Sequence, residues 1–203
     1  MYSRDQAAIE RWCKNPEKLL QVGTMVLLSI RMQWSGVGNQ MEDVAVNGSK
    51  SNCLWGWKRN GYKYLRDNRQ HLYRCIRDRR ACRTTTHELM REFLKVPGFG
   101  LPKAGFMVQL LTGNAGCLDM HNIERFGLDA NVWTIRTYRD TAKQTAEIDD
   151  KIDLYLRLCE ACGGSEKLWN EWCEYLNDKV STFNGADDVS ERHYIYLLDI
   201  PGD

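Results

Sequence analysis

A turn set between two helical patterns constrains the fold of this chain more than any other feature. The turn is Pro97-Gly98-Phe99-Gly100, where proline stops a helix and both glycines tolerate positive φ. Before it, Thr85 and Glu88 have the spacing of a capping box and predict the start of a helix. After it, residues 101–111 are apolar on nearly every side, which predicts a buried helix. The core must therefore form around two helices joined by a tight hairpin.

An acidic residue follows this unit after a short loop. Residues 113–116 break the second helix, and Asp119 takes the N-cap position of a third helix that reaches Phe126. The N–H groups at the start of the second helix, with the positive end of its dipole, suit a nucleic-acid phosphate. Residues 84–112 are thus interpreted as a helix-hairpin-helix motif, and residues 113–127 as the loop that holds an acid near the bound nucleotide.

Seven residues of this segment follow the order of a known motif: Pro97, Gly98, Phe99, Gly100, Ala104, Asp119 and His121. They resemble the helix-hairpin-helix (HhH-GPD) DNA glycosylase superfamily, which includes endonuclease III, over about a fifth of the 203 residues. The resemblance implies an all-α, two-lobed helical fold in which residues 1–203 form one domain that binds DNA and flips out a base.

One departure from the superfamily pattern concerns a lysine. In the strand-cleaving members a lysine nucleophile stands two residues after the second hairpin glycine. Here Pro102 takes that position, and Lys103 is turned about 100° further around the helix. This departure argues against imine chemistry and leaves open the monofunctional chemistry, which needs only the acid.

The sequence around the motif is similar to a bacteriophage branch of the superfamily. The similar segments are LPKAGF from residue 101, QL from residue 109 and GCLDMHN from residue 116. Members of this branch are alpha-glutamyl/putrescinyl thymine pyrophosphorylases, which act in DNA base hypermodification. The resemblance implies a transferase that places an amine or amino acid on 5-pyrophosphoryloxymethyl-uracil in DNA and releases pyrophosphate. Two alternatives stay open: a monofunctional glycosylase that excises a modified or damaged base, and a DNA-binding module without catalysis.

The resemblance also implies a catalytic set of Asp119, Lys103 and His121. Asp119 would stabilise positive charge at the nucleotide or activate the incoming nucleophile, and its alternative role is a plain N-cap. Lys103 would contact phosphate or pyrophosphate, or act as a displaced amine nucleophile. A role as a packed, hydrogen-bonded side chain explains His121 as well as a role in the pocket does.

Four further residues are candidates for substrate binding: Gln109, Cys117, Asn122 and His193. Gln109 lies in an otherwise apolar helix, so it must find a partner if it is buried. Cys117 offers a thiol nucleophile, although a small buried residue is the favoured alternative. Asn122 suits the edge of a base, and His193 matches a Ser-x-x-His ending of the phage branch.

A block of basic residues precedes the motif. Between residues 58 and 83 ten lysines and arginines stand against two aspartates, whereas the whole chain has a net charge of only +1. We expect Arg77, Arg80 and Arg83 to bind DNA phosphates together with the hairpin, and nearby aromatic residues to stack on bases. The alternative is a solvated helix face, with a buried stripe of Leu65, Leu72 and Ile76 behind it and the rings in the core.

The eight cysteines do not by themselves predict disulfides or a metal. No secretory signal or membrane span is recognisable, so we expect reduced thiols in a cytoplasmic monomer (the host cytoplasm if the gene belongs to a phage). Cys159, Cys162 and Cys173 are one ligand short of an iron–sulfur cluster, and zinc would need a fourth ligand such as His193. We therefore expect no metal or cofactor, with a monovalent cation at the hairpin left open, and DNA and a small amine or amino-acid donor as partners.

Apolar periodicity predicts the remaining elements, and no strand-like alternation recurs. Helices are expected to break near Asn15-Pro16 and to end at Gly163-Gly164, with Ser165 capping the next helix. The predicted core helices and loops are residues 22–34 (helix), 35–39 (loop), 146–162 (helix with Ile152, Tyr155 and Cys159 on its apolar face), 183–185 (loop) and 187–198 (closing segment).

Overall fold

The computed structural model describes residues 15–32, 36–81 and 83–184, and every regular element in these ranges is helical. In chain order they are α2 (Pro16–Leu28), α3 (Val37–Asn47), η2 (Gly48–Lys50), α4 (Trp57–Arg80), α5 (Thr86–Leu94), α6 (Leu101–Thr112), α7 (Met120–Arg125), η3 (Ala130–Trp133), α8 (Thr141–Ala161) and α9 (Gly164–Asn184). The all-α prediction is confirmed for this part of the chain. None of these helices combines the length and the apolar character that a membrane crossing requires.

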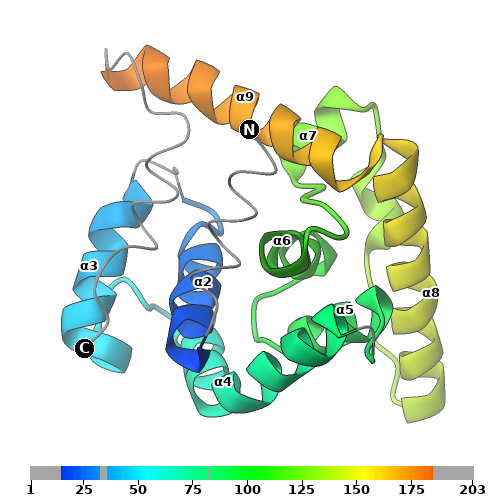
Figure 1. Ribbon diagram of the computed structural model, residues 1–203, viewed down its shortest axis with the longest axis horizontal. Coiled ribbons are helices and arrows are strands. Elements are labelled where there is room, and N and C mark those ends of the chain that lie inside the picture. Colours follow the sequence, from blue (N-terminus) through cyan, green and yellow to red (C-terminus); the bar gives the residue numbers. More distant parts are fainter. Residues whose placement is uncertain (1–14, 33–35, 82, 185–203) are drawn as a thin grey trace.

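Helix α6 is the centre of the fold. Figure 1 shows it nearly end-on, with α2, α4, α5, α8 and α9 arranged around it. Nine of its twelve residues are buried, as its all-round apolar sequence predicts. The buried apolar side chains from α2 to α9 belong to one continuous cluster, so the described residues share a single core.

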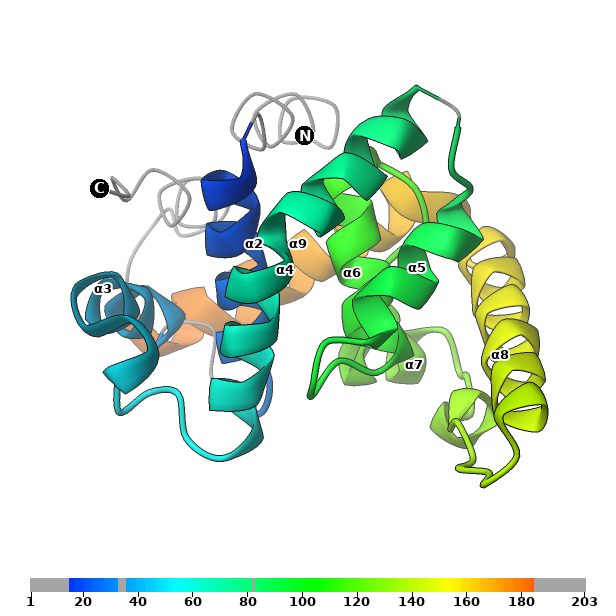
Figure 2. The same ribbon diagram turned by 90° about the horizontal axis from the view of Figure 1, so that it is seen from below.

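The capping-box prediction is confirmed. Thr85 Oγ1 accepts a hydrogen bond from the Glu88 N–H at 3.1 Å, and the Thr85 N–H donates to Glu88 Oε2 at 2.7 Å. Figure 2 shows α5 and α6 joined by the short hairpin. Only one of its two glycines uses positive φ: Gly98 has φ +93°, whereas Gly100 has an ordinary φ of −97° as the N-cap of α6. The turn therefore uses at Gly98 alone the positive φ that both glycines tolerate.

Gly98 also lies against Trp57, the first residue of α4. A Cβ on Gly98 would lie 2.3 Å from the Trp57 ring, whereas a Cβ on Gly127, at φ +61°, would meet nothing within 4 Å. We expect Gly98→Ala to lower the free energy of unfolding by about 2–4 kcal/mol, the sum of left-handed backbone strain and overpacking. Gly127→Ala carries only the backbone term of about 1–2 kcal/mol. Urea denaturation of both variants measures the difference, and equal losses would contradict this packing of the hairpin on α4.

The N-terminal helices differ from their predicted bounds. Asn15 caps α2 by accepting from the Lys18 N–H at 2.9 Å, so the break expected near Asn15-Pro16 is confirmed. The helix expected at 22–34 is instead the second half of α2, which ends at Leu28. The loop expected at 35–39 was wrong in part, because α3 starts at Val37 and buries one side of its surface. Two glycines in the sequence obscured this stripe, which consists of Val37, Met41 and Val44.

The C-terminal helices are longer than predicted. Helix α8 starts at Thr141 with Asp140 as its N-cap, five residues before the expected position. Ser165 lies inside the first turn of α9 and is not its cap. Gly163 and Gly164, at φ +101° and +80°, reverse the chain directly between α8 and α9, so α9 already begins at Gly164. Residues 183 and 184 are helical where a loop was expected. The predicted closing segment 187–198 lies outside the described residues.

Candidate functional site

Asp119 is the N-cap of α7, as the sequence predicted. Its Oδ1 accepts hydrogen bonds from the N–H groups of His121 and Asn122, both at 3.2 Å. The side chain is half-buried. The carboxylate is therefore held by the first turn of a helix and remains within reach of solvent.

The loop before Asp119 returns along α6. A Cβ on Gly105 would lie 2.7 Å from the Gly116 carbonyl oxygen, so these two glycines are in direct contact. Gly116 is only four residues beyond the end of α6, yet it contacts Gly105, which lies about two helical turns before that end. The loop thus carries Asp119 toward the N-terminal half of α6, where Lys103 and the hairpin are located.

Tyr155 of α8 holds this loop in place. Its hydroxyl donates to the Gly116 carbonyl at 2.7 Å and accepts from the Leu118 N–H at 2.9 Å. Burial raises the pKa of Tyr155 well above its ordinary value, so the hydroxyl keeps its proton across the neutral range. Sequence analysis counted Tyr155 only as part of an apolar face. A hydroxyl on such a face signals a hydrogen-bonding role, because a buried hydroxyl needs a partner.

Gln109 and Asn122 hold the loop from its other sides. Gln109 Oε1 accepts from the Cys117 N–H at 3.1 Å, and Gln109 Nε2 donates to the Ser165 carbonyl at 2.8 Å. Asn122 Nδ2 donates to the Cys117 carbonyl at 2.6 Å. Both amides are buried, so Gln109 finds the partners that its apolar helix required. A base edge would have to displace these bonds before either residue could bind a substrate.

Cys117 lies beneath Asp119 and is fully buried. Burial raises the pKa of the Cys117 thiol well above its ordinary value, the negative charge of Asp119 adds to this effect, and the positive charge of Lys103 opposes it. A thiol held in its neutral form is a poor nucleophile. This environment fits the alternative of a small buried residue.

Lys103 does not stand alone at the start of α6. Its Nζ donates to Ser29 Oγ at 3.2 Å, and the Nζ of Lys58, a buried residue of α4, donates to the Leu28 carbonyl at 2.9 Å. Both amines thus converge on the C-terminal end of α2, where free carbonyls and the helix dipole attract cations. Burial lowers the pKa of Lys58, and the charge of Lys103 lowers it further. The sequence predicted Lys58 as part of a solvated or DNA-binding block. That prediction was wrong, because the Lys58 side chain is buried.

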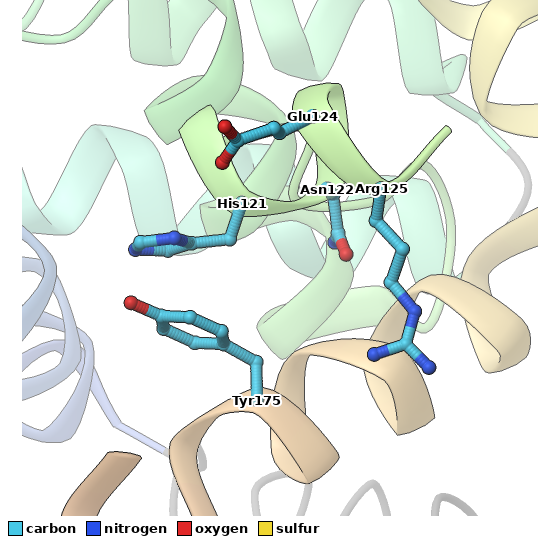
Figure 3. A pocket seen from close by; sticks show the side chains of 5 residues that line it. All are labelled: His121, Asn122, Glu124, Arg125 and Tyr175. Atoms are coloured by element: carbon cyan, nitrogen blue, oxygen red, sulfur yellow. The ribbon is translucent and has the colours of Figure 1, made fainter. Parts of the chain in front are cut away.

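An open pocket of about 250 Å³ lies between α7 and α9, beside Asp119. The His121 and Tyr175 rings, both labelled in Figure 3, are stacked on each other with centroids 3.6 Å apart and line one part of the pocket. The positive charge of Arg125 is compensated, because it pairs with Glu171 and with Glu174 at 3.1 Å. The remaining lining residues are Asn122 and Glu124.

Glu124 is the acidic residue that lines the pocket. Burial raises the pKa of Tyr175, and the negative charges of Asp119 and Glu124 raise it further. Among the described residues, no cation pairs with Glu124. Two stacked aromatic rings beside the Glu124 carboxylate suit a positively charged group such as an ammonium ion.

The three predicted DNA-binding arginines lie far from the hairpin. The hairpin packs on Trp57 at the start of α4, and Arg77 is twenty residues further along the same helix, or about 30 Å away. Arg77 is exposed. Arg80 donates to the Leu111 carbonyl at 3.0 Å, and Arg83 pairs with Asp78 at 2.8 Å. The structure therefore does not join these arginines and the hairpin into one compact patch.

The other predicted ligands do not meet in the described part of the chain. Cys159, Cys162 and Cys173 are buried, and His193 lies outside the described residues. Within the described ranges, no group of three or more His, Cys, Asp or Glu side chains has a metal-binding arrangement.

Comparisons of the chain with protein-family models, with curated proteins and with solved structures found no match. The all-α fold and the arrangement around Asp119 are therefore the observations on which a function can be built. The central arrangement is an N-capped acid, a lysine and an exposed hairpin gathered near the same end of a buried helix.

Proposed function

We propose that this protein is a bacteriophage enzyme of the helix-hairpin-helix DNA glycosylase superfamily that hypermodifies thymine in DNA. It would transfer an amine or amino acid onto 5-pyrophosphoryloxymethyl-uracil and release pyrophosphate. The observation that carries the proposal is the return of the loop before Asp119 along α6. Gly116 of this loop lies against Gly105, on the helix that starts with the hairpin and Lys103. The resemblance of this segment to the phage branch supplies the class of reaction.

The chemistry that we propose is a substitution at the exocyclic carbon of the flipped base. The amine nitrogen forms a bond to that carbon while the carbon–oxygen bond to pyrophosphate breaks, and pyrophosphate leaves with the electron pair. Asp119 accepts the proton that the amine loses. Lys103 stabilises the negative charge of the departing pyrophosphate. The pocket of His121, Tyr175 and Glu124 offers a place for the ammonium group of the donor before it reacts.

The hairpin would hold the DNA backbone during this reaction. At the start of α6, Pro102 has no N–H and the Lys103 N–H donates to the Gly100 carbonyl at 3.1 Å. The Leu101 N–H, beside the exposed Gly98 and Gly100, is therefore the backbone group that would bind a phosphate. Phosphate contacts of this kind position a duplex or a strand without reading its sequence. The target would therefore be selected at the flipped base and not by the hairpin.

Nucleoside mass spectrometry tests the reaction directly. The protein is incubated with DNA that contains 5-pyrophosphoryloxymethyl-uracil and a pool of amines and amino acids, and in parallel with a panel of damaged bases. We expect a heavier thymidine derivative and free pyrophosphate. Release of a free base with an abasic site would instead support the glycosylase alternative. Binding without any chemistry would support a DNA-binding module.

Gly100→Val tests the role of the hairpin. A Cβ at Gly100 has open space, with its nearest neighbour, in Pro102, 3.8 Å away, so the variant should fold with a loss of at most about 1 kcal/mol from the poorer N-cap. The side chain would cover the Leu101 N–H at the start of α6. We expect at least about a tenfold loss of affinity for DNA of any sequence, because hydrogen bonds to a charged group contribute ~1.5–3 kcal/mol. Fluorescence polarisation measures the affinity, and an unchanged value would refute phosphate binding by the hairpin.

A further inference from the structure

One large aromatic ring lies exposed beside the hairpin. The Trp55 side chain is 47% exposed. Its ring meets the Trp57 ring edge-on, with centroids 5.8 Å apart and an interplanar angle of 67°. The Trp57 ring in turn packs against Gly98 of the hairpin. Trp57 is thereby fixed by the hairpin, and it supports Trp55 at the boundary with solvent.

The surroundings of Trp55 are cationic. The Nζ of the buried Lys58 lies 5.6 Å from the centroid of the Trp55 ring and 5.9 Å from that of Trp57. Arg59 and Lys63 are exposed on the first two turns of α4, and the first turn contains no acidic residue. Because Lys58 is buried, the exposed Arg59 and Lys63 give this surface its positive charge, and such a surface attracts a polyanion.

An exposed ring, a cationic rim and the exposed backbone of the hairpin at Gly98 and Gly100 together match the parts of a nucleotide. The ring can stack on the flat face of a base, while the hairpin and the cations bind its phosphates. An apolar protein partner fits less well, because the exposed neighbours of Trp55 are polar or charged, or lack a side chain: Asn52, Gly56 and Arg59. Bases in a duplex already stack on one another, so a base that accepts Trp55 must be unpaired.

We propose that Trp55 stacks on an unpaired DNA base close to the phosphate that the hairpin binds. The inference rests on the proposed function for the identity of the polymer as DNA. It adds a preference for single-stranded or locally opened DNA, set by one side chain outside the pocket near Asp119.

The test compares Trp55→Ala with Trp55→Phe and with Tyr138→Ala as the matched control. Tyr138 is another exposed aromatic residue, 36% exposed, in the segment before α8. Affinities of the full chain are measured by fluorescence polarisation for a single-stranded oligonucleotide, for the same strand with abasic sites, and for its duplex. We expect Trp55→Ala to weaken single-strand binding by about 5- to 100-fold, the range for loss of one stacked base. Trp55→Phe should keep most of the affinity, and Tyr138→Ala should keep all of it.

The abasic strand separates stacking from a backbone contact. Trp55→Ala should not change binding to the abasic strand or to the duplex. An equal loss on all three DNAs, or no loss on any of them, would overturn the stacking proposal and leave the proposed function intact. Failure of the unaltered protein to bind any of the DNAs would overturn both.

Discussion

Asp119→Asn is expected to lower the turnover of the proposed transfer reaction by about 10²- to 10⁴-fold, the usual contribution of a general acid or base. Asparagine accepts the same hydrogen bonds from the N–H groups of His121 and Asn122 and caps a helix as well as aspartate does. The variant therefore removes a proton acceptor and a negative charge while the start of α7 is preserved. Turnover is followed as pyrophosphate release, and DNA affinity should remain at the level of the unaltered protein.

Asp140→Asn is the matched control. Asp140 is also an N-cap aspartate, and its Oδ1 accepts from the Lys143 N–H at 3.0 Å at the start of α8. This change removes the same charge from a helix outside the candidate site. Turnover should be unchanged in Asp140→Asn. Equal turnover in the two variants would show that Asp119 is only a cap.

Tyr155→Phe is expected to lower the free energy of unfolding by about 2–4 kcal/mol. The change removes a hydroxyl that serves two backbone groups, and each group left buried and unpaired costs roughly 1–3 kcal/mol. The ring stays, so no large cavity forms. Because burial raises the pKa of Tyr155, the hydroxyl remains protonated at neutral pH and the loss should not vary with pH there. Urea denaturation at several pH values near neutrality measures both expectations.

Tyr155→Phe should also reduce turnover, because Leu118 directly precedes Asp119 and loses its hydrogen-bond partner. Tyr138→Phe is the control, since it removes a hydroxyl from an exposed ring. It should change neither stability nor turnover. A Tyr155→Phe variant with the stability of the unaltered protein would refute the clamp on the loop. A stability loss without any loss of turnover would refute the link between the clamp and Asp119.

Much of the central segment could be predicted because its signals are local. The capping box joins residues three positions apart, and the cap at Asp119 uses N–H groups two and three residues away. The all-round apolar sequence of α6 likewise predicted burial without reference to any other helix. Helix ends were less predictable elsewhere. Gly36 and Gly38, for example, indicated a loop. Burial of Val37 and Met41 instead starts α3 at Val37, with Gly36 as its N-cap and Gly38 inside the helix.

The contacts that assemble the candidate site could not be predicted, because they join segments far apart in the chain. Lys58 reaches a carbonyl thirty residues away and becomes part of the core, although its sequence neighbours marked it as a surface cation. Tyr155 reaches Leu118 across 37 residues.

Residue types and short spacings by themselves determined the helices, the hairpin and the cap at Asp119, because hydrogen bonds within a turn satisfy them. Only the tertiary structure decided which cations lie beside the hairpin and which lie about 30 Å along α4. It also decided which polar groups hold the loop before Asp119. The physical reason is that a buried polar group must find a partner, and the packing of distant helices selects that partner.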